Sequence, residues 1–160
     1  AGGDFVVVDE FVNPISCPSS ETGLEKNMRF DPQPDFFQEF RTQIGAQNIL
    51  LLAGTHSNYY PRVDKDQGLK ESVVSAALYG ADAVVVGKNN LPELDTVSLP
   101  LPVFISGGIK ETDLSSVFSN KQVTGFLAGS LFERELHIID LDKTKKIVND
   151  IQGGIYEPNR

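Results

Sequence analysis

Short apolar runs alternate with amphipathic segments along almost the whole chain. Each run is rich in Val, Ile and Leu and is apolar on both faces, with no polar residue at every second position. That pattern is typical of strands that are buried on both sides, as in a parallel sheet. The runs are Phe5–Val8, Asn48–Ala53, Ala83–Gly87, Val103–Ser106 and Val123–Ala128.

The segments between the runs have apolar residues at helical spacing. Within 35–44, for example, Phe36, Phe40 and Ile44 share one face of a helix, and Gly45 ends the pattern. Gly80 is the expected C-terminal cap of a second helix, and Thr112 is an expected N-cap. The predicted helices are Asp35–Ile44, Gly68–Tyr79, Leu91–Val97, Thr112–Phe118 and Leu141–Ile151. Five consecutive strand–helix units indicate the α/β class.

Two architectures of this class compete. An open doubly wound sheet of five strands would be complete in 160 residues. A (β/α)8 TIM barrel needs about 250 residues, so these five units would be its last five. Glycine turns after the last two strands, and a first strand that begins within a few residues of the first residue, favour the barrel. We expect a partial TIM barrel with parallel strands in a single domain, 1–160, whose N-terminal units are missing.

The two glycine turns are the strongest functional signal. Gly107 and Gly108 follow the fourth predicted strand, and Gly129 and Ser130 follow the fifth. Glycine lets backbone N–H groups approach an anion closely, and the last two strands of many TIM barrels hold a substrate phosphate in this way. We therefore expect Gly107, Gly108, Gly129 and Ser130 to bind a phosphate group. Two ordinary tight turns are the alternative interpretation.

Three other residues are candidates for catalysis because they follow predicted strands. Glu10 stands beside Asp9 at the end of the first strand, where only one of two neighbouring residues can face the barrel mouth. His56 follows the second strand and can carry a proton near neutral pH. Lys88 follows the third strand and can pair with an anion or form a Schiff base. For each residue the alternative is a structural or solvent-exposed side chain.

Composition and net charge limit the classes of molecule that this chain is expected to bind. A net charge of −8 disfavours nucleic acid and anionic membranes as partners, and no apolar run is long enough for a transmembrane helix. The single cysteine, Cys17, rules out an internal disulfide and a cysteine-based zinc cluster, and it fits a reducing compartment such as the cytoplasm or an organelle matrix. The motifs for nucleotide, zinc or serine-hydrolase sites are absent, so we expect no metal and no cofactor. Self-association is left open.

Five segments together resemble the BtpA/SgcQ family of TIM-barrel proteins. They are GGDFVVVDEFVN, IGAQNILLLAGTHSN, GADAVVVGK, LPVFISGGIKETDL and VTGFLAGSLF, with a Gly23–Leu24 pair between the first two. They occur in the order and at the spacing of the later part of a family member, over roughly the first 130 residues. The last two segments are shared with many phosphate-binding barrels, so the first two are the discriminating ones.

The chain departs from the family pattern after its second strand. Gly54 stands where the family has an Asp, and Asn58 and Tyr59 stand where it has a Lys–His pair, so only His56 remains. The resemblance implies a barrel that binds a small phosphorylated sugar or nucleoside metabolite, with Glu10, His56 and Lys88 around the reacting part. The alternative is a non-enzymatic assembly or stability factor, as in photosystem I biogenesis, and the missing polar residues after the second strand favour it.

Overall fold

A computed structural model describes residues 3–16, 28–136 and 138–156. Cys17 and the Gly23–Leu24 pair, which the sequence analysis names, lie outside these residues, and so does His137. So does most of the proline-containing segment between Asn13 and Pro34.

Five parallel strands form the main sheet, in the same order as in the sequence. The order is β1-β4-β5-β6-β7, and every neighbouring pair is parallel. The strands are β1 (Phe5–Val8), β4 (Leu50–Thr55), β5 (Ala83–Gly87), β6 (Val103–Ser106) and β7 (Val123–Leu127). The α/β class and the parallel strands predicted from the apolar runs are confirmed.

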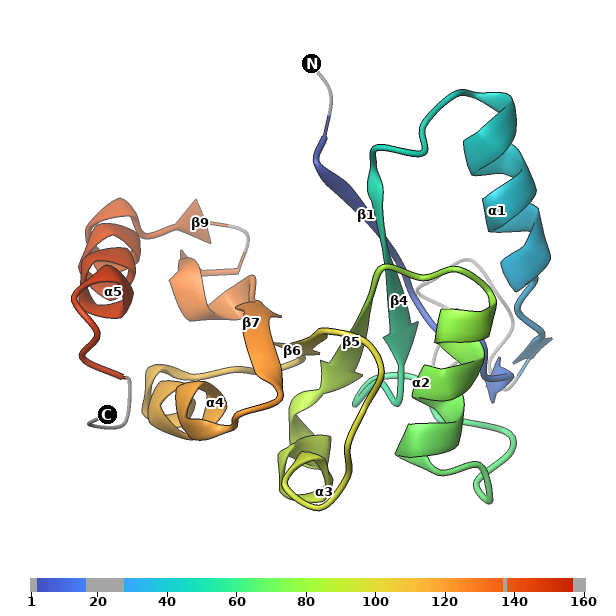
Figure 1. Cartoon of the computed structure of the whole chain (residues 1–160). Helices are drawn as coiled ribbons and strands as arrows, with labels where there is room; N and C mark the ends of the chain where they lie inside the picture. The colour runs from blue at the N-terminus through green and yellow to red at the C-terminus, as the bar shows by residue number, and fades with distance from the viewer. Residues whose placement is uncertain (1–2, 17–27, 137, 157–160) are drawn as a thin grey trace.

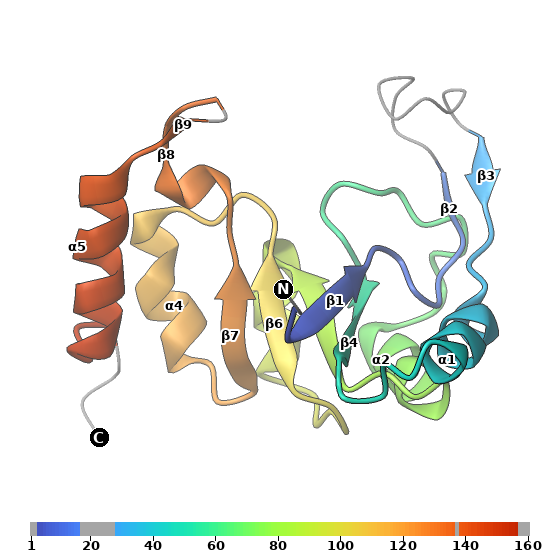
Figure 2. The ribbon, with the colours of Figure 1, turned by 90° about the horizontal axis from the view of Figure 1, so that it is seen from above.

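The helices lie together on the convex side of a curved sheet (Figures 1 and 2). They are α1 (Pro34–Gln43), α2 (Leu69–Leu78), α3 (Leu91–Leu94), α4 (Leu114–Ser119) and α5 (Leu141–Gln152). Helix α2 connects β4 to β5 and contacts both strands. Local signals explain the ends: Pro34 supplies a helical φ at the start of α1, and the Asp140 side chain caps α5 by accepting a hydrogen bond from the Lys143 N–H.

Two predicted helices are preceded by a short 3-10 helix in the structure. Of the segment predicted as Leu91–Val97, Leu91–Leu94 is helical (α3), and the 3-10 helix η2 (Lys88–Asn90) leads into it. The predicted N-cap at Thr112 is wrong, because a 3-10 helix η3 (Glu111–Asp113) precedes α4 and Asp113 accepts the Lys110 N–H at 2.7 Å. Asp113, the third residue of η3, thus reaches back to the N–H of the residue before the helix, as the acidic residue of a capping box does.

Two small antiparallel pairs lie outside the main sheet. The first pair is β2 (Ile15–Ser16) with β3 (Arg29–Phe30). The second is β8 (Glu133–Glu135) with β9 (Ile138–Ile139), and the 3-10 helix η4 (Ser130–Phe132) directly precedes β8. Strands of two or three residues are too short to produce a periodic hydrophobic pattern, so the sequence did not predict them.

Side chains from the two faces of the sheet form two apolar clusters. The larger cluster packs between the sheet and the helices and includes Val84, Val86, Ile105 and, from α5, Ile147, all completely buried. The smaller one lies on the opposite, concave face and contains Leu52, Ala83 and Val85, with Val7, Phe104 and Leu127 packed against them. Period-2 alternation along each strand produces both faces.

Within residues 3–16, 28–136 and 138–156 the sheet has two unpaired edges: β1 pairs with β4 on one side, and β7 pairs with β6 on one side. Figure 1 shows the strands on the inside of an arc and the helices on its outside, with an opening between β1 and β7. No helix in the described ranges is long and apolar enough to cross a membrane.

Candidate functional site

All seven predicted site residues lie at one edge of the sheet, at or just after the C-terminal ends of its strands. Parallel strands place these ends side by side, which is why the sequence pattern could find them. The residues separate into two groups. Glu10 and His56, after β1 and β4, are buried. Lys88, Gly107, Gly108, Gly129 and Ser130, after β5, β6 and β7, are half-buried or exposed.

Glu10 is a buried carboxyl group. Strand β1 ends at Val8, as predicted, but Asp9 and Glu10 lie in the turn that follows and not at the end of the strand, and Glu10 adopts a φ of 48°. The turn buries Glu10 to 1% exposure and leaves Asp9 exposed. Oε1 of Glu10 accepts the Ser57 N–H at 2.8 Å, whereas Oε2 has no hydrogen-bond partner among the described residues. Burial raises the pKa of this carboxyl, which favours its protonated form.

The turn that carries Glu10 crosses directly over Gly54 of β4. The Phe11 N–H donates to the Gly54 carbonyl at 2.7 Å. A Cβ atom at Gly54 would lie 2.9 Å from both the Glu10 nitrogen and the Val8 carbonyl oxygen. Backbone atoms cannot move aside as a flexible side chain can, so this position requires glycine. The carboxylate that the BtpA/SgcQ pattern has here would not fit this arrangement.

His56 points toward the first turn of α2. Its Nε2 lies 3.0 Å from Ser72 Oγ and 3.1 Å from an Arg62 Nη atom. An arginine can only donate, so Nε2 accepts and the proton of the neutral ring is on Nδ1. Ser72 Oγ, which has a single proton, lies 3.0 Å from both Asn13 Oδ1 and the Gly68 carbonyl oxygen, so the contact of Ser72 with Nε2 is not counted as a hydrogen bond. Asn13 Nδ2 donates to Thr55 Oγ1 at 2.6 Å. A continuous polar network therefore joins β1, β4 and α2.

This environment keeps His56 neutral. Burial, and after it the positive charge of Arg62, lower the pKa of His56 from 6.5 to about 4. Protonation would place an N–H donor against the arginine donor as well as a charge in a buried position. At neutral pH the ring is therefore an uncharged hydrogen-bond acceptor, with its lone pair already engaged.

Lys88 extends from the end of β5 to the turn after β6. Its Nζ donates to the Gly108 carbonyl oxygen at 3.0 Å and to Asp113 Oδ2 at 2.9 Å. The pKa of Asp113 is lowered, mainly by its hydrogen bond from Lys88 and then by the Lys110 N–H. An ammonium group has three N–H donors, so one remains for a further acceptor.

The two glycine turns differ in backbone conformation. Gly107 and Gly108 have φ values of 82° and 65°, in the left-handed region that favours glycine. Gly129 has a φ of −93° and immediately precedes Ser130, the first residue of η4. Apart from the adjoining residues, no atom in the described part of the chain lies within 4 Å of where a Cβ would stand on Gly108 or Gly129. The space beside both turns is therefore open.

Asn58 connects the two groups. Its Nδ2 donates to the Gly107 carbonyl oxygen at 3.4 Å, and its Oδ1 accepts the Asn89 N–H at 3.3 Å. Asn58 follows Ser57, whose backbone N–H donates to Glu10 Oε1. The buried group after β1 and β4 is thus linked along the strand ends to the glycine turn after β6.

Sequence reasoning missed three residues of this edge: Arg62, Ser72 and Asp113. Ser72 interrupts the apolar stripe of α2 next to Val73, and a serine in a buried stripe is a detectable signal. Asp113 follows Lys110 by three residues, which is the spacing of a capping interaction. Arg62 lies in a loop without periodicity, so only the tertiary structure reveals its role. No group of three His, Cys, Asp or Glu side chains within the described part of the chain is arranged to hold a metal ion.

Comparison of the chain with protein-family models, with curated proteins and with solved structures gave no match. The structure therefore establishes a parallel α/β sheet of five strands with interleaved helices, and no family is identified for it.

Proposed function

We propose that this chain binds a small phosphorylated molecule, such as a sugar or nucleoside phosphate, at the C-terminal edge of its sheet. The phosphate would occupy the space beside the turns at Gly107–Gly108 and Gly129–Ser130. The observation that carries this proposal is the position of Lys88, whose ammonium group lies at the Gly108 carbonyl with one N–H donor to spare. Strands β6 and β7 are hydrogen-bonded neighbours, so the two open turns lie at adjacent strand ends.

We further propose that the five units are consecutive units of a (β/α)8 barrel related to the BtpA/SgcQ family. The strand order supports this, because a doubly wound sheet reverses its order at a switch point, whereas here spatial order follows chain order. Helices on the convex face alone agree with it (Figure 1). The glycine at position 54 opposes a close relationship to that family.

Within this proposal the candidate catalytic residues have different roles. Glu10 suits acid–base chemistry, because burial raises the pKa of its carboxyl and Oε2 is not engaged by the described residues. The lone pair of His56 Nε2 already accepts a hydrogen bond from Arg62, so we assign His56 to positioning Arg62 and the end of β4 and not to proton transfer. Lys88 contacts the phosphate.

Calorimetric titration with inorganic phosphate and with ribose 5-phosphate at pH 7 tests the phosphate site. The sharpest variants are Gly129→Asp and Gly129→Asn, which have the same shape and differ by one charge. Both should fold, because φ is negative and the Cβ space is empty at Gly129. We expect the wild type and Gly129→Asn to bind ribose 5-phosphate and Gly129→Asp to lose at least tenfold in affinity, about 1.4 kcal/mol. Absence of binding by the wild type, or equal binding by the two variants, would overturn the proposal.

A non-enzymatic assembly factor is the second candidate, and the apolar surface at both ends of the sheet favours it. Phe5, Phe36, Phe40 and Ile44 at one end are each about half exposed, and such patches mark protein-binding surfaces. This candidate predicts that Glu10→Gln leaves function intact while Phe40→Asp removes it, and that no phosphate binds.

A further inference from the structure

The turn that follows β4 crosses the ends of the next two strands on the concave side of the sheet. A Cβ atom on Gly87, the last residue of β5, would lie 2.7 Å from the backbone nitrogen of Asn58. Gly87 stands two residues after Val85, which belongs to the concave cluster, so this Cβ would point to the concave face. A Cβ on Gly107, directly after β6, would lie 3.2 Å from Asn58 Nδ2. Asn58 therefore lies over the strand ends at the inner side of the curved sheet.

Neighbouring elements fix the backbone of this turn. His56 adopts a φ of 51°, a left-handed conformation that is strained for a residue other than glycine and that persists only where the surroundings hold it. Its carbonyl oxygen accepts hydrogen bonds from the Gly87 N–H at 3.2 Å and from Asn90 Nδ2 at 3.0 Å. The next N–H, that of Ser57, donates to Glu10 Oε1 at 2.8 Å. The turn therefore holds Asn58 in place before any ligand binds.

The amide of Asn58 has both a donor and an acceptor to spare. Nδ2 donates to the Gly107 carbonyl oxygen at 3.4 Å, and Oδ1 accepts the Asn89 N–H at 3.3 Å. An amide has two N–H donors and two acceptor lone pairs, so within the described part of the chain each atom uses half of its capacity. Asn58 is exposed to solvent. Because a hydroxyl group both donates and accepts, hydroxyl groups suit such a donor–acceptor pair.

Asn58 and Lys88 lie side by side. Nδ2 of Asn58 contacts the Gly107 carbonyl oxygen, and Nζ of Lys88 contacts the next one, that of Gly108, at 3.0 Å. Successive Cα atoms are only about 3.8 Å apart, so a small molecule can contact both side chains at once. A phosphate group at Lys88 would place the adjoining part of the same molecule next to Asn58.

We propose that Asn58 is a specificity-determining residue of the phosphate site and binds hydroxyl groups of a sugar whose phosphate contacts Lys88. This inference rests on the proposed phosphate site and narrows its substrate class to sugar phosphates. A phosphate ester without hydroxyl groups would use only Lys88 and the glycine turns. The amide adds affinity for the sugar part alone.

Calorimetric titration at pH 7 with ribose 5-phosphate and with pentyl phosphate tests this role. Pentyl phosphate has the phosphate group and the same number of carbon atoms but no hydroxyl group. The wild type should bind ribose 5-phosphate about tenfold more tightly, which is the effect of one or two hydrogen bonds. Asn58→Leu has a side chain of similar size without polar atoms. It should bind the two ligands about equally, with the affinity that the wild type has for pentyl phosphate.

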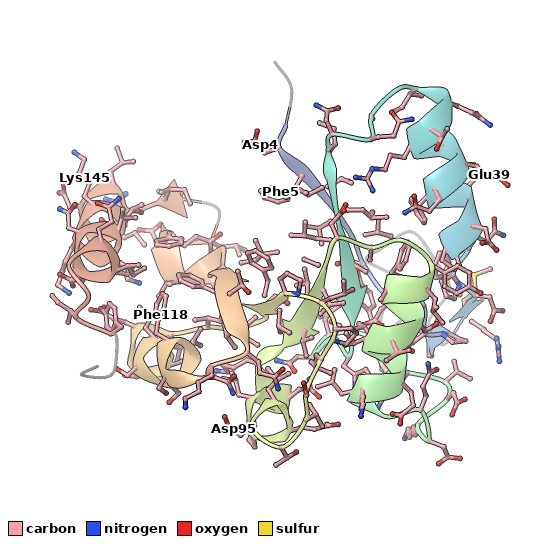
Figure 3. The ribbon with its side chains drawn as sticks, viewed as in Figure 1. Asp4, Phe5, Glu39, Asp95, Phe118 and Lys145 are labelled. Carbon is pink, nitrogen blue, oxygen red and sulfur yellow. The ribbon has the colours of Figure 1, made fainter. Side chains whose placement is uncertain are left out.

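Asn48→Leu is the matched control, because it makes the same substitution at the opposite edge of the sheet. Figure 3 shows Asp4 and Phe5 at the start of β1. The N–H of Leu50, the first residue of β4, donates to the Asp4 carbonyl oxygen at 3.0 Å, and Asn48 precedes Leu50 by two residues. Asn48 is also exposed, so this variant should keep the preference of the wild type for ribose 5-phosphate.

Asn58→Asp is an independent test of the distance to the phosphate. It keeps the shape of the side chain and adds a negative charge, so it should weaken the binding of both ligands. Asn58 is exposed, and circular dichroism should show both variants at this position folded.

The contrary results separate this inference from the phosphate site itself. A wild type that binds neither ligand would overturn both. A wild type that binds the two ligands equally, or an Asn58→Leu variant that keeps the preference, would overturn the role of Asn58 and leave the phosphate site standing. An equal loss of both ligands in Asn58→Leu would show that Asn58 only supports the turn at Gly107. Unchanged binding of pentyl phosphate by Asn58→Asp would place Asn58 too far from the phosphate and also overturn the inference.

Discussion

Replacing His56 by Gln should change how the stability of this protein depends on pH. The pKa of folded His56 is about 4, against 6.5 for an ordinary histidine. As the pH falls below 6.5 the unfolded chain therefore binds a proton that the folded chain does not, and the free energy of unfolding decreases. Each pH unit in this interval removes about 1.4 kcal/mol, so the total loss by pH 4 is about 3 kcal/mol.

Urea unfolding of the wild type and of His56→Gln, followed by circular dichroism from pH 4.5 to pH 8, measures this effect. Gln keeps an acceptor for Arg62 but does not titrate. The strain of a residue other than glycine at a φ of 51° is common to both proteins. Any other cost of the substitution that does not depend on pH cancels when the difference in the free energy of unfolding is followed against pH. We expect the difference to be flat above about pH 7 and to change in favour of the variant by about 2.7 kcal/mol at pH 4.5.

Two outcomes would refute the reasoning. Parallel stability curves between pH 4.5 and pH 7 would mean that His56 titrates alike in the folded and unfolded chains. A ring-proton NMR titration with a midpoint near 6.5 would show the same directly. The chain has only two histidines, so a His137→Gln variant assigns the signals.

Three further predictions concern Glu10 and the glycines. Because burial raises the pKa of Glu10 above 4.5, the folded chain loses stability as the pH rises through that raised pKa. In urea unfolding, the free energy of unfolding of Glu10→Gln should therefore increase relative to that of the wild type above pH 4.5. A difference between the two proteins that does not depend on pH would contradict this. Gly108→Ala should lower the free energy of unfolding by about 1 to 2 kcal/mol, because the φ of Gly108 is 65°. Gly129→Ala has equal space but a negative φ, so its free energy of unfolding should stay within about 0.5 kcal/mol of the wild type. Equal thermal midpoints for the two variants would refute this difference in backbone strain. Gly54→Ala should cost about 1 to 3 kcal/mol through contact with the β1 turn, measurable by urea unfolding, and a neutral result would show that this turn can move.

The sequence by itself determined the class of the fold and the edge at which the polar residues gather. Runs such as Ala83–Gly87 are apolar on both faces, and only a strand covered on both sides has that requirement. Parallel strands bring their C-terminal ends to one edge, so chain position alone placed Glu10, His56, Lys88 and the two glycine turns together. Helix ends were predicted where a local residue acts, as at Gly80, and missed where Asp113 rather than Thr112 supplies the cap.

Only the tertiary structure decided what these residues can do. The state of His56 depends on Arg62 and Ser72, which are six and sixteen residues away, and the burial of Glu10 depends on a turn that packs over Gly54. The same holds for the apolar residues of α1 and α5: their spacing predicts two amphipathic helices, but which part of each face stays uncovered depends on the two edges of the sheet that are unpaired within the described residues. The burial, charge state and accessibility of a side chain depend on neighbours that are distant in the sequence, and hydrophobic periodicity does not predict which residues those neighbours are.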